Sequence, residues 1–182
     1  MSSLIIDEAI HADTHHKDLK RIVAISIDEE SGEYVYDWAI NNFINPDTDL
    51  VVFLNCRQID APAAPYINPT GFIEEFDEKR KIKSHQLLRF YADQLKFANI
   101  AVRAIALAGE PKMEIIRKVT ELNADVLLLG SRRLGTVKRA LLGSVSDYCG
   151  HKSPCTVIIV KAHPSHPQGK HELRSVFKRH VE

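Results

Sequence analysis

The stretch Asp125–Arg133, D-V-L-L-L-G-S-R-R, together with Gly143–Ser146, G-S-V-S, decides the fold of this chain. Its first five residues form a short apolar strand, and Gly130 stands where that strand ends. Glycine lets backbone N–H groups approach a ligand closely, and the second segment opens a helix whose N-terminal amides attract anions. Three basic residues add positive charge nearby: Arg132, Lys138 and Arg139. We therefore expect a phosphate-binding turn, although a plain strand-to-helix loop with capping hydroxyls would have the same spacing.

Two other glycine motifs do not fit this segment. Four residues separate Gly130 from Gly135, as in a P-loop, but Thr136 and Val137 stand where that motif needs Lys and Ser or Thr. The pattern G-x-G-x-x-G, which marks dinucleotide sites, occurs nowhere in the sequence. A Walker mechanism and nicotinamide chemistry therefore have no support.

The composition is that of an ordinary globular domain with a sizeable core, with 45% hydrophobic residues in 182. Basic and acidic residues number 24 each, so no overall field favours nucleic acid or a membrane surface. The amino-terminal residues lack the pattern of a signal peptide, and we expect a cytoplasmic protein, with or without nuclear presence, that has no transmembrane segment. The three cysteines lack metal-ligand spacing and are expected to be reduced: Cys56, Cys149 and Cys155.

Strands and helices alternate along the chain. The patterns predict strands at Arg21–Ile27, Leu50–Cys56, Ile100–Ala108, Asp125–Leu129 and Cys155–Lys161, and helices at Tyr34–Ile44, Glu74–Ala98, Lys112–Leu122 and Ser144–His151. Parallel neighbours need long crossovers, so we expect an α/β fold: an open five-stranded parallel sheet with helices on both faces, Rossmann-like and single-domain. Ligands of such sheets bind beyond the carboxyl ends of the strands, where Asp28, Gly109 and Gly130 all fall.

The motif resembles the signature of the nucleotide-binding universal stress proteins, which is Gly, two residues, Gly, nine residues and then Gly-Ser or Gly-Thr. Here residues 130–146 read G-S-R-R-L-G-T-V-K-R-A-L-L-G-S-V-S. The resemblance covers about residues 20–161, including the acid after the first strand and the G-E-P turn after the third.

That resemblance implies an ATP site, with Asp28 and the strand segment at Val51 beside adenine. It further implies Gly109 near the nucleotide, and Gly130 at the ribose and phosphates. It also implies that Gly143, Ser144 and Val145 contact the triphosphate. We add three residues of the same segment as candidate binding residues: Arg132, Arg133 and Ser146.

Arg133 departs from the family pattern, because it occupies the position of the second signature glycine. If that position needs a positive φ, a non-glycine residue costs about 1–2 kcal/mol, and its side chain would enter the pocket. A guanidinium can also pair with phosphate in a bidentate manner. Both alternatives stay open.

The function implied is that of an adenine-nucleotide-binding regulatory protein in stress response, acting through its bound or dimeric state. Hydrolysis needs a positioned base and metal ligands, and neither is evident, so a slow Mg-dependent ATPase is the lesser alternative. A nucleotide-free dimerising scaffold is the other, because Cys155–Lys161 is an apolar strand at an expected sheet edge. The choice among ATP, AMP and a cyclic nucleotide stays open.

Two polar tails flank the expected domain, which spans residues 20–161. Residues 1–19 and 162–182 contain most of the histidines, whose scatter favours solvated segments over a metal site. The second tail is basic, and its apolar residues have helical spacing. Such a helix would pack on its own domain or dock on a partner or membrane surface.

Overall fold

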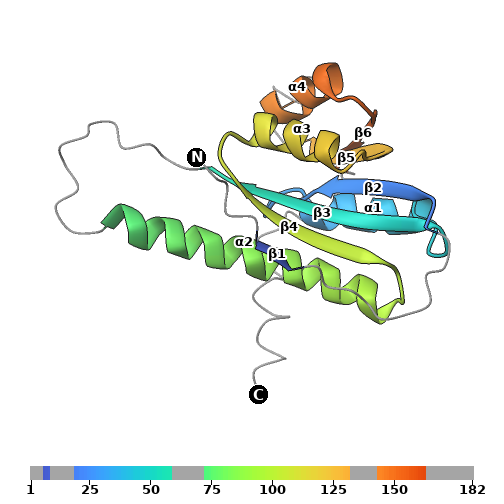
Figure 1. The fold of residues 1–182 in the computed structure, drawn as a ribbon, viewed down its shortest axis with the longest axis horizontal. Helices are drawn as coiled ribbons and strands as arrows, with labels where there is room; N and C mark the ends of the chain where they lie inside the picture. Colours follow the sequence, from blue (N-terminus) through green and yellow to red (C-terminus); the bar gives the residue numbers. More distant parts are fainter. Residues whose placement is uncertain (1–5, 9–18, 59–71, 132–142, 163–182) are drawn as a thin grey trace.

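The computed structural model describes residues 6–8, 19–58, 72–131 and 143–162, and a six-stranded sheet forms its centre (Figure 1). The strands lie in the order β1-β4-β3-β2-β5-β6. Their bounds are β1 (Ile6–Glu8), β2 (Arg21–Ser26), β3 (Asp49–Arg57), β4 (Val102–Ala108), β5 (Val126–Ser131) and β6 (Thr156–Lys161). Strands β2 to β6 are mutually parallel, which confirms the predicted α/β sheet.

Strand β1 is an addition that the sequence patterns did not predict, since its residues were assigned to the amino-terminal tail. It pairs antiparallel with β4, with Ile6 opposite Ala106 and Glu8 opposite Ala104. An edge strand presents unpaired backbone N–H and C=O groups, and a short added strand satisfies part of them. The described sheet therefore has five parallel strands and one antiparallel strand.

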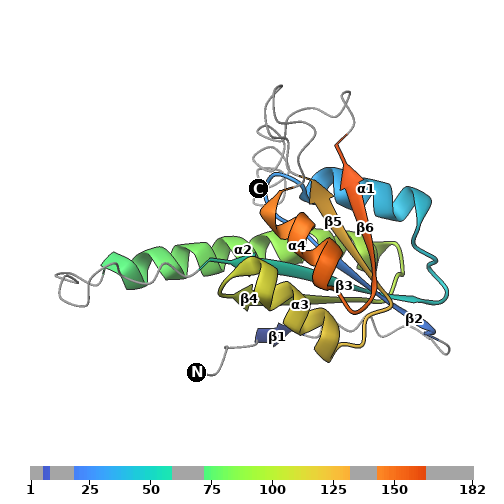
Figure 2. The ribbon, with the colours of Figure 1, turned by 90° about the horizontal axis from the view of Figure 1, so that it is seen from above.

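Helices cover both faces of the sheet, as predicted (Figures 1 and 2). On one face lie α1 (Gly32–Asn42) and α2 (Phe72–Phe97), and on the other α3 (Pro111–Glu121) and α4 (Ser144–Lys152). Successive residues of a strand point to opposite faces, so Val23 joins the α1–α2 core and Ala24 the α3–α4 core. The sheet is therefore packed on both faces, and this packing fixes the positions of its strand ends.

The amino ends of β2 and β3 are closed by a buried ion pair. Arg21 Nε and Nη2 donate to the two Asp49 carboxylate oxygens at 2.9 and 2.5 Å. The Asp49 side chain is buried and also accepts the Asn45 backbone N–H at 2.8 Å. The Arg21 guanidinium lies 4.5 Å from the centre of the Phe43 ring. At this end of the sheet, the buried Asp49 carboxylate is therefore paired with Arg21 of the same chain.

Candidate functional site

The carboxyl ends of the parallel strands form the rim where a ligand is expected. The chain passes from β2 outward to β3 and β4, then returns to place β5 on the other side of β2. The strand order therefore switches between β2 and β5, and ligands of open α/β sheets bind at that switch. Asp28 follows β2 and Gly130 lies near the end of β5, so the structure brings both to the switch point.

Asp28 fixes the start of α1. Its Oδ1 accepts the backbone N–H groups of Glu30 at 3.0 Å and Ser31 at 2.6 Å. A carboxylate at a helix start is also favoured by the helix dipole. The side chain thus has a structural role in addition to any role toward a ligand.

Gly130 permits a close approach between β5 and the start of α1. A Cβ atom at Gly130 would lie 2.3 Å from the Ser31 Cβ and 2.7 Å from the Tyr34 hydroxyl oxygen. That hydroxyl donates to the Ser131 backbone oxygen at 2.7 Å. The glycine is therefore required by packing at the switch point, whatever else it does.

The α4 start presents a different geometry. Gly143 is the N-cap residue with φ −65° and ψ 153°, and among the described residues a Cβ there would meet only the Ser146 hydroxyl, at 3.7 Å. The buried Ser146 hydroxyl donates to the Gly143 backbone oxygen at 3.0 Å, and Val145 packs into the α3–α4 core. Ser144 is exposed at the first helical position. Of these four residues, Ser144 presents its side chain to solvent at the helix N-terminus.

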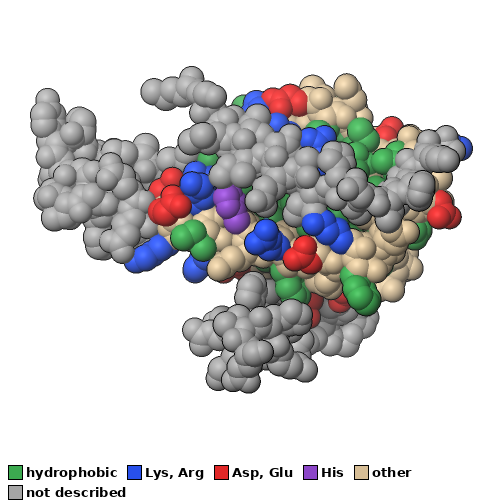
Figure 3. All heavy atoms as spheres, turned by 60° about the horizontal axis from the view of Figure 1, so that its bottom comes forward, with side chains coloured by type: hydrophobic (Ala, Val, Ile, Leu, Met, Phe, Trp, Pro, Cys, Tyr) green, Lys and Arg blue, Asp and Glu red, His purple; other side chains and the backbone are tan. Residues whose placement is uncertain are grey.

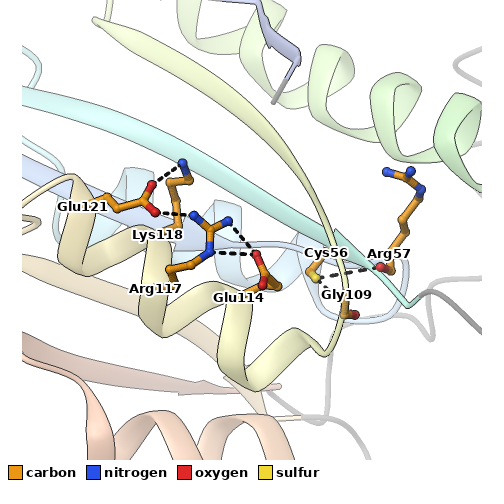
Figure 4. Close-up of polar contacts among 7 residues, drawn as sticks. All are labelled: Cys56, Arg57, Gly109, Glu114, Arg117, Lys118 and Glu121. Carbon is orange, nitrogen blue, oxygen red and sulfur yellow. Dashed lines mark hydrogen bonds and ion pairs between the residues drawn. The ribbon is translucent and has the colours of Figure 1, made fainter. Parts of the chain in front are cut away.

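Gly109 follows β4 and contacts the end of β3 through its backbone (Figure 4). Its φ is +141°, and its backbone N–H donates to the Arg57 oxygen at 3.0 Å. A Cβ there would lie 3.0 Å from Glu114 Cγ, so both backbone and space favour glycine. Cys56 Sγ lies 3.8 Å from the Gly109 oxygen, and burial raises the pKa of the Cys56 thiol to about 12. The thiol at this junction is therefore neutral at physiological pH.

Charged residues on α3 fix the position of Glu114 next to Gly109. Arg117 donates to Glu114 Oε2 at 2.6 Å and also contacts Glu121 (Figure 4). Lys118, which is buried, donates to Glu121 at 2.6 Å, and this contact chiefly lowers the pKa of the Glu121 carboxyl. The network stabilises the helix that follows the β4 turn.

Val51 does not lie at the rim. It is the third residue of β3, fully buried, and stands opposite Val23 and Val102 in the sheet. The run L-V-V-F-L is apolar throughout, so it does not reveal which residue reaches the carboxyl end. Asn55, four residues later, lies nearer the carboxyl end of β3 and lines a hollow there, and the sequence analysis did not name it.

A hollow of about 360 Å³ opens between the carboxyl ends of β2 and β3 and the side of α2. Its lining comes from the loop after β2, the end of β3 and one face of α2: Asp28, Glu29, Glu30, Asn55, Cys56, Arg57, Gln58, Arg80, Lys83, Ser84 and Leu87. Glu29, Glu30 and Lys83 are exposed, whereas Asn55, Ser84 and Leu87 are buried. The charged lining residues Asp28, Arg57 and Arg80 are partly buried, so charged groups extend from the mouth into the hollow.

An ion pair and a hydrogen bond hold α2 against the end of β3. Arg57 donates to both carboxylate oxygens of Asp77, at 3.0 and 3.3 Å, and Arg80 donates to the Gln58 backbone oxygen at 3.1 Å. Seen from the α2 side, basic and acidic side chains lie together on the described surface (Figure 3). The described part of this face thus carries both signs of charge.

Some predicted site residues and tail features lie outside the described residues. They include Arg132 and Arg133, the neighbouring Lys138 and Arg139, and the histidines of both tails. Within the described ranges, His, Cys, Asp and Glu side chains form no group of three or more suited to hold a metal ion. Among the helices that the structure describes, none has the length and apolar character needed to span a bilayer.

Comparison with known proteins identifies the family of this chain. A sequence model of the universal stress protein family matches residues 19–161. The chain is 24% identical over 133 residues to a universal stress protein A-like protein of Arabidopsis thaliana, which covers 69% of this chain and 75% of that protein.

Two solved structures share the fold. One is a universal stress protein family protein from Arabidopsis thaliana with AMP bound, with a TM-score of 0.60 and 22% identity over 80% of this chain and 94% of that one. The other is a universal stress protein in complex with cAMP, with a TM-score of 0.52 and 21% identity over 80% of this chain and 100% of that one. Since the family model spans most of the sequence, the chain belongs to the universal stress protein family.

Proposed function

We propose that this chain is an adenine-nucleotide-binding regulatory protein, with ATP as its ligand, either alone or with Mg²⁺. The observation that carries the proposal is the hollow beside the switch point, at the rim where α4 also begins. The family members with AMP and cAMP bound support an adenine nucleotide as the ligand class. We assign binding to residues 20–161.

The charges suggest how the nucleotide lies. Equal numbers of acids and bases line the hollow, so its charges give no net attraction for a phosphate chain: Asp28, Glu29 and Glu30 against Arg57, Arg80 and Lys83. The α4 N-terminus, with exposed Ser144 and free-ended backbone N–H groups, attracts anions instead. We therefore place the adenosine end in the hollow and the phosphates toward α4. Along the rim, Gly130 lies on the β5 side of the hollow and Gly109 on its β4 side.

Arg132 and Arg133 complete this proposal as residues of the phosphate end. If Arg133 clamps phosphate, Arg133→Gly weakens ATP binding more than adenosine binding. If it obstructs the pocket, the same substitution strengthens ATP binding. Titration of both proteins with ATP and adenosine separates the two.

The function is tested first on the unaltered protein. Mass spectrometry of small molecules released by denaturing the purified protein is expected to identify an adenine nucleotide, and calorimetry is expected to detect ATP binding. A folded protein that binds neither ATP, AMP nor cAMP would overturn the proposal.

Ser144→Ala tests the phosphate end. A hydrogen bond to a charged group contributes about 1.5–3 kcal/mol, so ATP affinity should fall roughly 10- to 150-fold while the fold is kept. Thr120→Ala is the matched control, because its hydroxyl is exposed on α3 and donates to the Ile116 backbone oxygen. Unchanged ATP affinity in folded Ser144→Ala would remove Ser144 from the site.

A homodimer through β6 is a second part of the proposal. Strand β6 is an edge of the described sheet, and its apolar residues Val157, Ile158 and Ile159 are partly exposed. An apolar edge of this kind favours pairing with a second copy about a two-fold axis. Sedimentation at micromolar concentration is expected to report a dimer, and a monomer would contradict this part alone.

A further inference from the structure

The outer side of β4 is an apolar strand edge with few of the features that prevent strands from pairing with a neighbour. All seven of its residues pair with β3 in unbroken register, so no bulge interrupts it. Its sequence, V-R-A-I-A-L-A, contains no proline and one charged residue, Arg103. Charges, prolines and bulges are the usual means of protecting an edge, so an edge that lacks most of them is prone to pair with another strand.

Strand β1 is the element that the structure places on this edge (Figures 1 and 2). Its three residues pair antiparallel with Ala104–Ala106, the middle of β4. Two residues at each end of β4 have no partner in β1: Val102 and Arg103, and Leu107 and Ala108. Strand β1 therefore covers the centre of the edge and leaves its two ends uncovered by β1.

The pairing of so short a strand is weak by itself. Three residue pairs supply few hydrogen bonds, while ordering the backbone of each residue in the segment costs conformational entropy of similar size. The two contributions nearly cancel. Strand β1 therefore occupies the edge by a small margin and can be displaced.

The covalent connection favours β1 over a competing strand from another molecule. Residues 9–20 join β1 to β2 within one chain. A flexible connection of this length gives the tethered segment an effective concentration of about 1 mM at its site, far above that of a separate protein molecule at micromolar concentration. The chain's own segment is therefore the first occupant of the edge, and a second copy is excluded while that segment is bound.

We propose that the β4 edge is a strand-addition surface for a second copy of this chain, and that Ile6–Glu8 guards it. When β1 is displaced, β4 pairs antiparallel with β4 of the second copy about a two-fold axis. A pair centred on Ile105 places Arg103 opposite Leu107 of the other copy, so the two arginines do not face each other. This surface lies at the opposite side of the sheet from β6, and its use does not depend on nucleotide binding.

Asp7→Pro in the full chain tests the guard. Proline removes the backbone N–H in the middle of β1 and is disfavoured inside a ladder, so β1 should leave the edge. Sedimentation at micromolar concentrations should then report a mass that rises with concentration above that of the unaltered protein. Ser3→Pro is the matched control, because it places the same residue in the same segment but outside β1, and it should sediment like the unaltered protein.

Hydrogen exchange tests the edge directly. At concentrations too low for association, the β4 amides that face β1 should exchange about 3- to 10-fold faster in Asp7→Pro, since each loses a backbone hydrogen bond. The amides of β2, in the middle of the sheet, should exchange equally in both proteins if the variant is folded. Unchanged exchange in β4 would show that β1 does not cover the edge and would overturn the proposal.

A peptide added in trans identifies the surface that associates. A synthetic peptide of residues 2–13 should reduce the association of the Asp7→Pro protein, whereas the same peptide with Asp7→Pro should not. If the peptide leaves association unchanged, the contact lies elsewhere and the proposal fails. It fails also if β4 exchange rises in the variant while its mass stays that of the unaltered protein, because the open edge then does not pair with a second copy.

Discussion

The two ends of the parallel sheet treat their buried polar groups in opposite ways. At the amino end, Asp49 is buried and accepts hydrogen bonds from Arg21 and from backbone. At the carboxyl end, the Ser84 hydroxyl is equally buried but finds no partner among the described residues. Buried polar groups are normally paired, so the first arrangement serves stability, whereas the second leaves one hydroxyl uncompensated. The predictions below test whether a change at one end leaves the other unaffected.

Asp49→Ala should produce the largest change. Removing one partner of a buried ion pair costs about 3–5 kcal/mol, because the other charge loses its compensation. Arg21 keeps 33% side-chain exposure and can reach water, so we expect the lower end, about 3 kcal/mol. Urea denaturation measures this loss as a lower midpoint with an unchanged slope.

Asp49→Asn is the matched control, since the amide keeps the shape and one acceptor oxygen. It should fall between the unaltered protein and Asp49→Ala in stability. Adenosine affinity of the folded protein should be the same in all three. An Asp49 variant that changes adenosine affinity several-fold would show that the two ends are coupled, and the comparison would break.

Gly130→Ala and Gly143→Ala should differ although both glycines belong to the same motif. The Gly130 Cβ would lie 2.3 Å from the Ser31 Cβ, so α1 must shift away from β5, at a cost of about 1–3 kcal/mol. At Gly143 the nearest contact would be 3.7 Å and φ is −65°, so alanine fits.

Thermal unfolding should therefore separate the two variants by several degrees, with Gly143→Ala close to the unaltered protein. ATP affinity should fall in Gly130→Ala because the switch point itself is displaced. Equal melting temperatures in the two variants would refute the packing role of Gly130.

Most of the fold could be predicted from the sequence, and the element that could not be predicted has a physical reason. Apolar runs and helical spacing located the five parallel strands and four helices, because burial on both faces of a sheet leaves a clear pattern. Strand β1 has only three residues, and its pairing with β4 depends on a distant edge rather than on its own pattern. Such a strand cannot be recognised from local sequence.

The candidate site was less accessible. Asp28 and Gly109 follow strands and Gly130 lies near the end of one, so their place at the rim could be expected. Val51 lies buried in the first half of β3, and a uniformly apolar run does not show which residue reaches the carboxyl end. Its contact with adenine stays a prediction. Ser84 lies mid-helix with no motif around it, and only the packing of α2 against β3 brings it to the hollow.

The smallest expected effect concerns the exposed ion pair that ties α2 to the carboxyl end. The Arg57 guanidinium, by its hydrogen bonds, holds the pKa of the Asp77 carboxyl below its ordinary value. The Asp77 side chain is 42% exposed, so the pair contributes only about 0.2–0.5 kcal/mol, and Asp77→Asn should remove that amount at pH 7.

The pH dependence fixes the sign of this prediction. A carboxyl whose folded-state pKa is depressed adds stability above its unfolded value, near 3.9, and loses it as the pH falls through the lower folded value. The stability gap between the unaltered protein and Asp77→Asn should therefore be constant from about pH 5 to 8 and close below pH 4. Salt at about 1 M should also narrow it at pH 7, because screening reaches exposed pairs. Urea midpoints at pH 7 and pH 3 measure the gap, and a gap that widens toward acid would mean that Asp77 is stabilised in its protonated form instead.

The amino end of the sheet supplies the contrast. The stability difference between the unaltered protein and Asp49→Ala should change little with salt, since buried pairs are poorly screened.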